Sequence, residues 1–316
     1  MKVTVQNEVW PNFFIIGAMK SGTTSLYHYL TKVNGIFMSS VKEPNYFAST
    51  DFPLDTYLEV IRDKTTYLSL FSTAKNVIAR GEASTNYLYS EQAAFRIKEI
   101  VPNAKIIAIL RNPIDRAYSH YLQYVRNKYE NAHNLSFLEA ISKDYELKNK
   151  GIGVSALYVE KGLYYMQVKR YIDLFGRENV KVIFFEEFTN HPREHVEKVL
   201  EFLQINSEIP DNVGKVYNKT FIPNSKFGKS LVSSKKITYL VKSIPEPIKK
   251  QMRKYILSNF HESNTKKQMR KYIVGEAAEI KDIPTEARDY LERIYKDDVF
   301  QLKALLRRPI PWKDFS

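Results

Sequence analysis

The residues best suited to chemistry lie in one short loop, residues 17–25, which reads GAMKSGTTS. The loop follows the apolar run 13–16 and precedes apolar residues at helical spacing, so we expect it to join a buried strand to a helix. Backbone amides and the helix dipole at such an N-terminus attract an anion. Lys20 would add a mobile positive charge, and Gly17 and Gly22 would let the backbone approach the anion closely. Hydroxyl donors would come from Ser21, Thr23, Thr24 and Ser25.

The order of residues in this loop differs from the Walker A motif of ATP- and GTP-binding proteins. That motif needs a glycine, four further residues, and then Gly-Lys-Ser or Gly-Lys-Thr. Here Gly22 is followed by Thr23, and Lys20 comes two residues before Gly22. The loop therefore predicts phosphate binding without the magnesium-binding arrangement. An ordinary turn that caps a helix is the structural alternative.

A second strand followed by a helix carries another candidate anion site. The apolar run 106–110 predicts a buried strand, and Pro113 stands where the first helical turn would begin, a position that favours proline. We expect this helix to continue to about Arg126. Arg111 ends the strand and Ser119 follows eight residues later, so a guanidinium fork and a hydroxyl can grip one phosphate. A surface ion pair is the alternative for Arg111 alone.

In this order, the two motifs resemble those of sulfotransferases that use 3′-phosphoadenosine-5′-phosphosulfate (PAPS). The run 17–24 resembles the family's 5′-phosphosulfate loop, and the run 111–121 resembles its 3′-phosphate motif, in which an arginine and a serine eight residues later hold the phosphate. Residues 42–47 are similar to a Lys-Glu-Pro segment of the heparan-type branch, which includes N-deacetylase/N-sulfotransferases and 3-O-sulfotransferases. The resemblance, to this branch and to bacterial members, covers roughly residues 11–230.

Two further segments extend the resemblance. Residues 161–164 are similar to a Gly-x-Tyr segment near the cofactor, and residues 218–226 resemble a late basic segment that closes over PAPS. The resemblance therefore implies PAPS as the co-substrate and 3′-phosphoadenosine-5′-phosphate (PAP) as the product. The cofactor-binding residues that it implies are Lys20, Ser21, Gly22, Thr23, Thr24, Ser25, Arg111, Ser119, Tyr164 and Lys226.

The resemblance also implies the chemistry, in which a sulfuryl group passes from PAPS to a hydroxyl or amine by in-line displacement. As in phosphoryl transfer, positioning and charge stabilisation would supply most of the catalysis. Lys20 would stabilise charge on the bridging oxygen. Glu43 would be the general base, because the heparan-type branch places its catalytic glutamate in the Lys-Glu-Pro context. A structural pairing with Lys42 is the alternative for Glu43, and Glu82, which we expect after another strand, is the reserve base.

Histidine chemistry and metal chemistry are weaker fits to this sequence. Other sulfotransferase branches use a histidine, but His120 lies inside the expected phosphate-clamp helix, where packing or a cofactor-side role fits better. The histidines in polar stretches, which we expect at the surface, are His133, His191 and His195. The sequence has no dense carboxylate cluster that would hold a metal, so we expect no metal ion.

Composition narrows the class of protein further. The 316 residues contain no cysteine, which excludes disulfides and a cysteine nucleophile and suits a reducing, cytoplasmic location. Lys and Arg number 48 against 35 Asp and Glu, a net charge of +13, so we expect an anionic ligand. We expect no membrane span, because no run approaches about eighteen apolar residues, and residues 1–11 lack the pattern of a signal peptide.

The acceptor stays open between a glycan or glycolipid and a small natural product, and the oligomeric state stays open between a monomer and a homodimer. We expect segments 47–71 and 124–158, which are rich in tyrosine and charge, to select the acceptor. A magnesium-dependent P-loop kinase or NTPase is one alternative function, weakened by the missing Gly-Lys-Ser/Thr order. A basic nucleic-acid-binding protein is another, but no zinc finger, helix-turn-helix or RNA-binding signature supports it.

Strand and helix signals alternate along most of the chain. A third strand, 180–185, follows a helix over about 164–174, and the alternation predicts an α/β fold, a P-loop-like, doubly wound parallel sheet flanked by helices. We expect one domain, 1–316, with a core of about 11–225 and a helical C-terminal extension of about 226–316. The extension repeats the octapeptide KKQMRKYI at 249–256 and 266–273. A local duplication explains this repeat, and two basic helical faces that grip an anionic partner are the alternative.

Overall fold

The computed structural model describes five stretches of the chain, residues 8–56, 58–74, 77–127, 134–217 and 282–315. Contacts between Cα atoms divide the chain into two compact units. The first comprises Met1–His120, Phe137–Lys219 and Pro284–Ser316, and the second comprises Tyr121–Ser136 and Thr220–Ile283. Lys226, His133, the octapeptide repeat and the expected boundary near residue 225 lie outside the described residues. The division into core and extension therefore stays a prediction.

A single parallel sheet organises the first unit. The described residues form five strands, β1 (Phe13–Gly17), β2 (Ile36–Met38), β3 (Ala79–Ala83), β4 (Lys105–Leu110) and β5 (Val180–Phe184). Their order in the sheet is β2-β3-β1-β4-β5, and every neighbouring pair is parallel. The predicted doubly wound α/β sheet is confirmed, with three of its strands at the predicted positions. The short strand β2 was not predicted.

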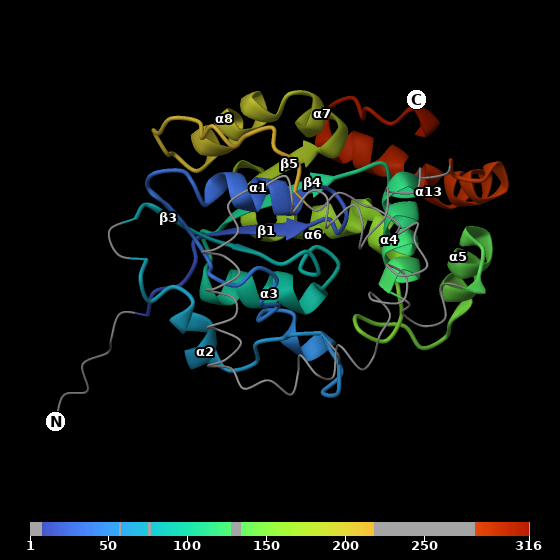
Figure 1. Cartoon of the computed structure of the whole chain (residues 1–316), viewed down its shortest axis with the longest axis horizontal. Helices are drawn as coiled ribbons and strands as arrows, with labels where there is room; N and C mark the ends of the chain where they lie inside the picture. Colours follow the sequence, from blue (N-terminus) through green and yellow to red (C-terminus); the bar gives the residue numbers. More distant parts are fainter. Residues whose placement is uncertain (1–7, 57, 75–76, 128–133, 218–281, 316) are drawn as a thin grey trace, which may run out of the picture. The chain divides into compact units, whose positions relative to one another are not determined.

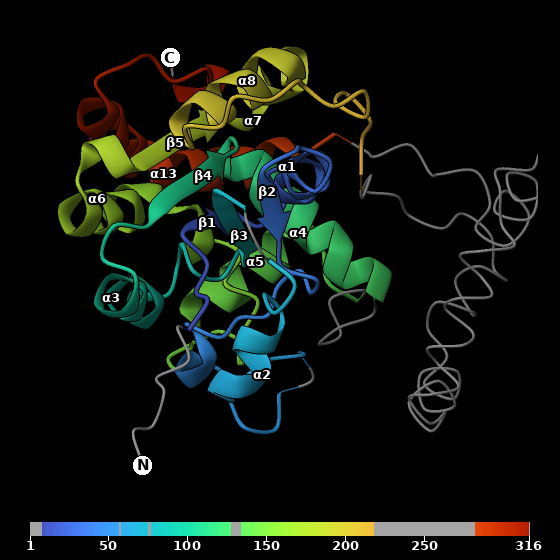
Figure 2. The same cartoon turned by 90° about the vertical axis from the view of Figure 1, so that its left-hand side faces the viewer.

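Helices cover both faces of this sheet (Figures 1 and 2), and the central strand β1 is accordingly apolar and fully buried. The side chains of Phe13, Ile15 and Ile107 join a core that includes residues of three helices, α1 (Thr23–Leu30), α7 (Phe185–Asn190) and α8 (Pro192–Phe202). On the other face, α6 (Tyr164–Phe175) contacts β4 and β5, and α3 (Glu91–Ile100) packs beside α6. There the ring of Phe14 meets the edge of Phe47, with 5.4 Å between their centroids.

Four more α-helices lie in the described residues: α2 (Lys64–Ser69), α4 (Pro113–Asn127), α5 (Phe137–Glu146) and α13 (Thr285–Leu306). The last of these packs against α6. Asp298 on α13 accepts hydrogen bonds from the backbone amides of Tyr164, at 2.7 Å, and Tyr165, at 3.1 Å. Because the first amides of a helix have no acceptor within the helix, α13 supplies one for α6. No helix in the described part of the chain is long and apolar enough to cross a membrane.

Gly81 allows β1 and β3 to pair at close range. In the register of these strands it lies opposite Phe13, and a Cβ atom at position 81 would lie 2.1 Å from Cζ of Phe13 and 2.6 Å from Sδ of Met38. Only a residue without a side chain fits here. The residue that follows it, Glu82, is thereby held in the middle of the sheet.

We expect Gly81→Ala to lower the free energy of unfolding by about 2 to 3 kcal/mol, because the added methyl group overpacks the core. Gly151→Ala is a matched control, since a Cβ atom there would meet its nearest neighbour, Cγ2 of Val154, at an ordinary 3.6 Å. Urea unfolding of both variants measures the difference. Equal unfolding midpoints for the two variants would contradict this packing.

Candidate active site

The residues predicted to do chemistry gather at one edge of the sheet. Because all strands run parallel, the loops that follow them leave from the same edge. The chain passes from the central strand β1 to β2 and β3 on one side, and then to β4 and β5 on the other. Ligands in open α/β sheets bind outside the strand ends where the order reverses in this way, here between β1 and β4. The loop 18–22 follows β1, and Arg111 follows β4.

The loop after β1 has the geometry that the sequence predicted. Helix α1 begins at Thr23, and Gly22 before it has a left-handed φ of 83°. A Cβ atom at position 22 would lie 3.1 Å from the ring of Phe185, so glycine also permits close packing. Lys20 has a left-handed φ of 68°, a conformation that costs a non-glycine residue energy and persists only where its surroundings hold it. The loop is therefore a constrained turn at a helix N-terminus.

The hydroxyl groups of this loop differ in their surroundings. Ser21, Thr23 and Ser25 are buried, whereas Thr24 is half-buried. Ser25 Oγ already accepts a hydrogen bond from the backbone amide of Tyr217, at 3.3 Å. The buried Ser21 Oγ has no hydrogen-bond partner in the described part of the chain. Such an atom is costly unless a ligand or a water satisfies it, so Ser21 fits an anion-binding role.

Arg111 joins the two predicted anion sites. Its Nη1 donates a hydrogen bond to the backbone oxygen of Lys20, at 3.2 Å, and its guanidinium lies over the ring of Phe185, 4.9 Å from the centroid. Burial lowers the pKa of Arg111, while Asp115 and Glu186 partly offset that effect. The structure thus places the arginine of the second motif directly against the loop of the first.

The two other residues predicted to bind the cofactor near Arg111, Ser119 and Tyr164, are both buried. Ser119 is buried on α4, two helical turns after Arg111. Tyr164 is fully buried, and its hydroxyl donates to the backbone oxygen of Arg111, at 3.0 Å. Burial raises the pKa of Tyr164, so the phenol stays protonated. The Tyr164 hydroxyl therefore supports Arg111 from behind.

Acidic residues that sequence reasoning missed anchor the start of α4. Glu186, just after β5, accepts from the backbone amide of Asn112, at 2.9 Å, and from Nε1 of the buried Trp312, at 3.0 Å. Nδ2 of Asn112 donates to Asp314, at 2.6 Å. The sequence could have pointed to Glu186 through its position, because it comes two residues after a strand that ends at the same edge of the sheet. The segment that holds Arg111 is thus fixed by residues far away in the sequence.

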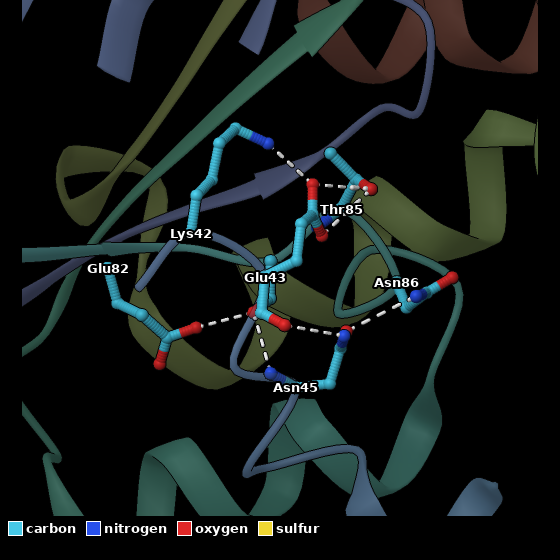
Figure 3. A network of polar contacts seen from close by, with 7 residues as sticks. Lys42, Glu43, Asn45, Glu82, Thr85 and Asn86 are labelled. Atoms are coloured by element: carbon cyan, nitrogen blue, oxygen red, sulfur yellow. Dashed lines mark hydrogen bonds and ion pairs between the residues drawn. The ribbon is translucent and has the colours of Figure 1, made fainter. Parts of the chain in front are cut away.

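Glu43 lies at this edge on the β2 and β3 side, with its carboxylate pinned by two neighbours (Figure 3). Oε2 accepts from the backbone amide of Thr85, at 2.7 Å, and Oε1 accepts from Nζ of Lys42, at 2.6 Å. The backbone amide of Glu43 donates to the oxygen of Ala83, at 2.9 Å, which ties this segment to the end of β3. The Glu43 side chain remains 32% exposed. It is an oriented carboxylate that a substrate can still reach.

Glu82, the reserve base, has a different environment. It lies inside β3, where we had expected it to follow a strand, and it is fully buried. Its carboxylate accepts hydrogen bonds from the hydroxyls of Ser84, Tyr67 and Tyr87. Burial raises the pKa of Glu82 to about 7, and the nearby charge of Glu43 adds to the increase. A group enclosed in this way does not face an acceptor.

One of the histidines that we predicted at the surface is buried. His195 is buried, 8% exposed, because it lies on α8 where that helix meets the core beside Phe188, whereas we had expected it at the surface. His191 is exposed as predicted. His120 is fully buried, its ring lies 5.1 Å from that of Tyr158, and burial holds its pKa well below the usual value. A neutral, enclosed imidazole fits the expected packing role.

Lys161 adds a cation that sequence reasoning had named only as part of a segment. Its Nζ donates to Oδ1 of Asn86, at 3.2 Å. Nδ2 of Asn86 donates to Asn45, also at 3.2 Å, and Nδ2 of Asn45 donates to the backbone oxygen of Glu43, at 2.9 Å. Burial lowers the pKa of Lys161 to about 8, with the charge of Arg116 acting in the same direction.

No group of three or more metal-binding side chains occurs among the residues described.

The comparison with known proteins now decides the family. The sequence profile of the family described as "Sulfotransferase domain" matches residues 11–301. The chain belongs to the sulfotransferase family. The family match agrees with the resemblance of the two phosphate motifs and favours it over the kinase and nucleic-acid-binding alternatives.

Individual relatives agree with this assignment. The sulfotransferase is 26% identical over 290 residues to mouse bifunctional heparan sulfate N-deacetylase/N-sulfotransferase 4, an alignment that covers 90% of this chain and 32% of the relative. It is 26% identical over 245 residues to human carbohydrate sulfotransferase 15, covering 62% of this chain and 44% of that one. The chain thus spans less than half the length of these curated relatives. A solved sulfotransferase from Alicyclobacillus acidocaldarius is 30% identical and superposes with a TM-score of 0.68, covering 96% of this chain and 98% of its own.

Glu82 should make the stability of this sulfotransferase depend on pH. Its pKa rises from 4.5 to about 7 on folding, so the folded state binds the proton more tightly, and this stabilisation is lost as the pH rises through about 7. Glu82→Gln removes the titration. We expect the difference in unfolding free energy between wild type and variant to shift by about 3 kcal/mol between about pH 4 and pH 8, against the wild type at high pH. Urea unfolding at several pH values measures the shift, and a difference that does not change with pH would contradict a raised pKa.

Proposed function

We propose that this sulfotransferase uses PAPS and transfers its sulfuryl group to a hydroxyl or amine of an acceptor, with release of PAP. The observation that carries the proposal is the hydrogen bond from Arg111 Nη1 to the backbone oxygen of Lys20, at 3.2 Å. It brings a guanidinium and a constrained helix N-terminal loop together between β1 and β4. PAPS carries phosphates at both its 3′ and 5′ positions, and a site with two adjoining anion clamps fits such a molecule.

The chain's own residues divide into two clamps under this proposal. The backbone amides of the 18–22 loop and the start of α1, with Lys20 and the hydroxyls after it, would hold the 5′-phosphosulfate. Arg111 and Ser119 would hold the 3′-phosphate, with Tyr164 supporting Arg111. The buried Ser21 Oγ would gain the partner that the described residues do not supply. Lys226, which lies outside the described residues, remains predicted to close over the cofactor.

Sulfuryl transfer then needs one bond to form and one to break. The acceptor oxygen or nitrogen attacks sulfur, and the bond from sulfur to the bridging phosphate oxygen breaks. Glu43 takes the acceptor proton, since its carboxylate is partly exposed and is held in place by Thr85 and Lys42. Lys20 stabilises the charge that develops on the bridging oxygen. The catalytic residues of this proposal are therefore Lys20 and Glu43, and no step requires a metal ion.

The acceptor that these features favour is an acidic glycan, although a small natural product stays the alternative. Lys42 pairs with Glu43, and Lys161 lies near enough to interact with the charge of Glu43, so positive charge gathers close to the proposed base. The names of the relatives, which include heparan sulfate and carbohydrate enzymes, point in the same direction. The cytoplasmic location and the choice between monomer and homodimer stay predictions.

Calorimetry with PAP in metal-free buffer, and with ATP plus magnesium, tests the cofactor. We expect PAP to bind at micromolar concentration or tighter and ATP to bind far more weakly. Lys20→Ala and Arg111→Ala should each lower the affinity for PAP by at least about tenfold, because each removes a charge-assisted hydrogen bond. Lys198→Ala is the control, since Lys198 is exposed on α8 and pairs with Glu194. Binding of ATP with magnesium in place of PAP would return the chain to the kinase alternative.

Glu43→Gln tests the general base separately from the cofactor. The amide keeps the size of the side chain but cannot take the proton, so we expect kcat to fall by about a hundredfold or more. The affinity for PAP should stay within about twofold, because Glu43 belongs to the acceptor side of the site. Steady-state turnover with an acidic glycan acceptor, beside calorimetry with PAP, measures both. Normal turnover in this variant would refute the assignment of Glu43.

A further inference from the structure

The segment that carries Glu43 has a backbone that needs external support. Between β2 and the aromatic cluster around Phe47, Glu43 and Asn45 both have left-handed φ angles, 62° and 53°. Neither is glycine, so each conformation costs energy and persists only where neighbouring groups hold it. We call residues 43–47 the base turn. The direction of the Glu43 carboxylate depends on how firmly this turn is held.

Two hydroxyl groups from the segment after β3 hold the base turn. The backbone amide of Asn45 donates to Ser84 Oγ, at 3.1 Å, and the backbone amide of Phe47 donates to Tyr87 Oη, at 3.1 Å. Figure 3 shows Glu82 and Asn45, the two residues that Ser84 connects by its hydrogen bonds. Each hydroxyl uses its oxygen to accept from the turn, which leaves its proton to be placed elsewhere.

Both protons go to one carboxylate. Ser84 Oγ donates to Oε1 of Glu82, at 2.6 Å, and Tyr87 Oη donates to Oε2, at 3.2 Å. In its ionised form this carboxylate only accepts hydrogen bonds, so it fixes both hydroxyls with their lone pairs toward the turn. The hydroxyl of Tyr67, on α2, also donates to Oε2 but contacts no amide of the base turn. Glu82 is fully buried, so this arrangement is closed to solvent.

We propose that Glu82 is a positioning residue for sulfuryl transfer, which orients Ser84 and Tyr87 so that they hold the base turn and aim Glu43 at the acceptor. The inference rests on the proposed role of Glu43 as the base. Glu82 itself touches no substrate. Burial raises the pKa of Glu82, whereas the hydrogen bonds from Ser84, Tyr67 and Tyr87 lower it and so favour the carboxylate form. A displacement of the reacting groups by about 1 Å can cost about a hundredfold in rate, which is the scale of effect available to such a residue.

Three substitutions interrupt the connection at different points. Glu82→Gln replaces one accepting oxygen by a donor, Ser84→Ala removes one link to the turn, and Tyr87→Phe removes the other. We expect each to lower kcat by about tenfold or more while the KM for PAPS and the affinity for PAP stay within about twofold. Tyr67→Phe is the matched control for Tyr87→Phe, because it removes a hydroxyl that donates to the same oxygen but not one that accepts from the turn, and it keeps the ring that stacks on Tyr46. Its loss of kcat should be several-fold smaller.

The decisive measurement combines Glu82→Gln with Glu43→Gln. If Glu82 acts through Glu43, Glu82→Gln should lower kcat no further once the base is gone. Multiplied losses in the double variant, or a fall in PAP affinity that matches the fall in kcat, would overturn the proposal and leave Glu82 a general structural residue. So would normal kcat in both Glu82→Gln and Ser84→Ala while Glu43→Gln is impaired.

These experiments also separate the inference from the proposed function. Normal turnover in Glu43→Gln would refute the base itself, whatever Glu82 does. If Glu82→Gln fails to fold, as judged by its circular dichroism and its PAP binding, Ser84→Ala still tests the proposal, because it leaves the buried carboxylate in place. Ser84→Thr restores a hydroxyl at the same position. It should recover part of the kcat that Ser84→Ala loses, and no recovery would count against a hydrogen-bonded link.

Discussion

The direction of the strands is the constraint on which the site depends. In a sheet whose strands all run parallel, every loop that follows a strand leaves from the same edge. The loop after β1 and Arg111 after β4 therefore meet, although 91 positions separate Lys20 from Arg111. The segments after β2 and β3 bring Glu43 and Thr85 to the same edge. An antiparallel strand at any of these positions would carry its residue to the opposite edge.

Positive charge accumulates at this edge, and the surrounding structure is arranged to tolerate it. Burial lowers the pKa of both Arg111 and Lys161, which means that each cation is more costly here than in water. Glu186 lies near Arg111, and Glu43 lies near Lys161, so carboxylates partly offset the cost. The remaining positive charge is what an anionic cofactor would neutralise. Perturbed pKa values of this kind cluster at functional sites.

Sequence patterns that are local in the chain predicted the parts of the site that are local in space. Each buried strand, each helix start and the spacing of Arg111 and Ser119 is a pattern that spans no more than about ten residues of the chain. Strand β3 includes Arg80, Gly81 and Glu82, which do not form an apolar run, so a strand was expected only before Glu82, and the burial of Glu82 inside the strand was not visible. The contacts of Glu82 with Tyr67, of Glu186 with Trp312 and of His195 with Phe188 depend on tertiary packing. No periodicity in the sequence encodes such contacts.

The most direct test of the two-clamp account compares PAP with adenosine 5′-monophosphate, which lacks the 3′-phosphate, on wild type and Arg111→Ala. If Arg111 holds the 3′-phosphate, the variant should lose about ten- to a hundredfold in affinity for PAP and almost none for the monophosphate. The two ligands should then bind the variant with similar affinities. Equal losses for both ligands would contradict the account, because they would mean that Arg111 only supports the Lys20 loop through its hydrogen bond to that backbone.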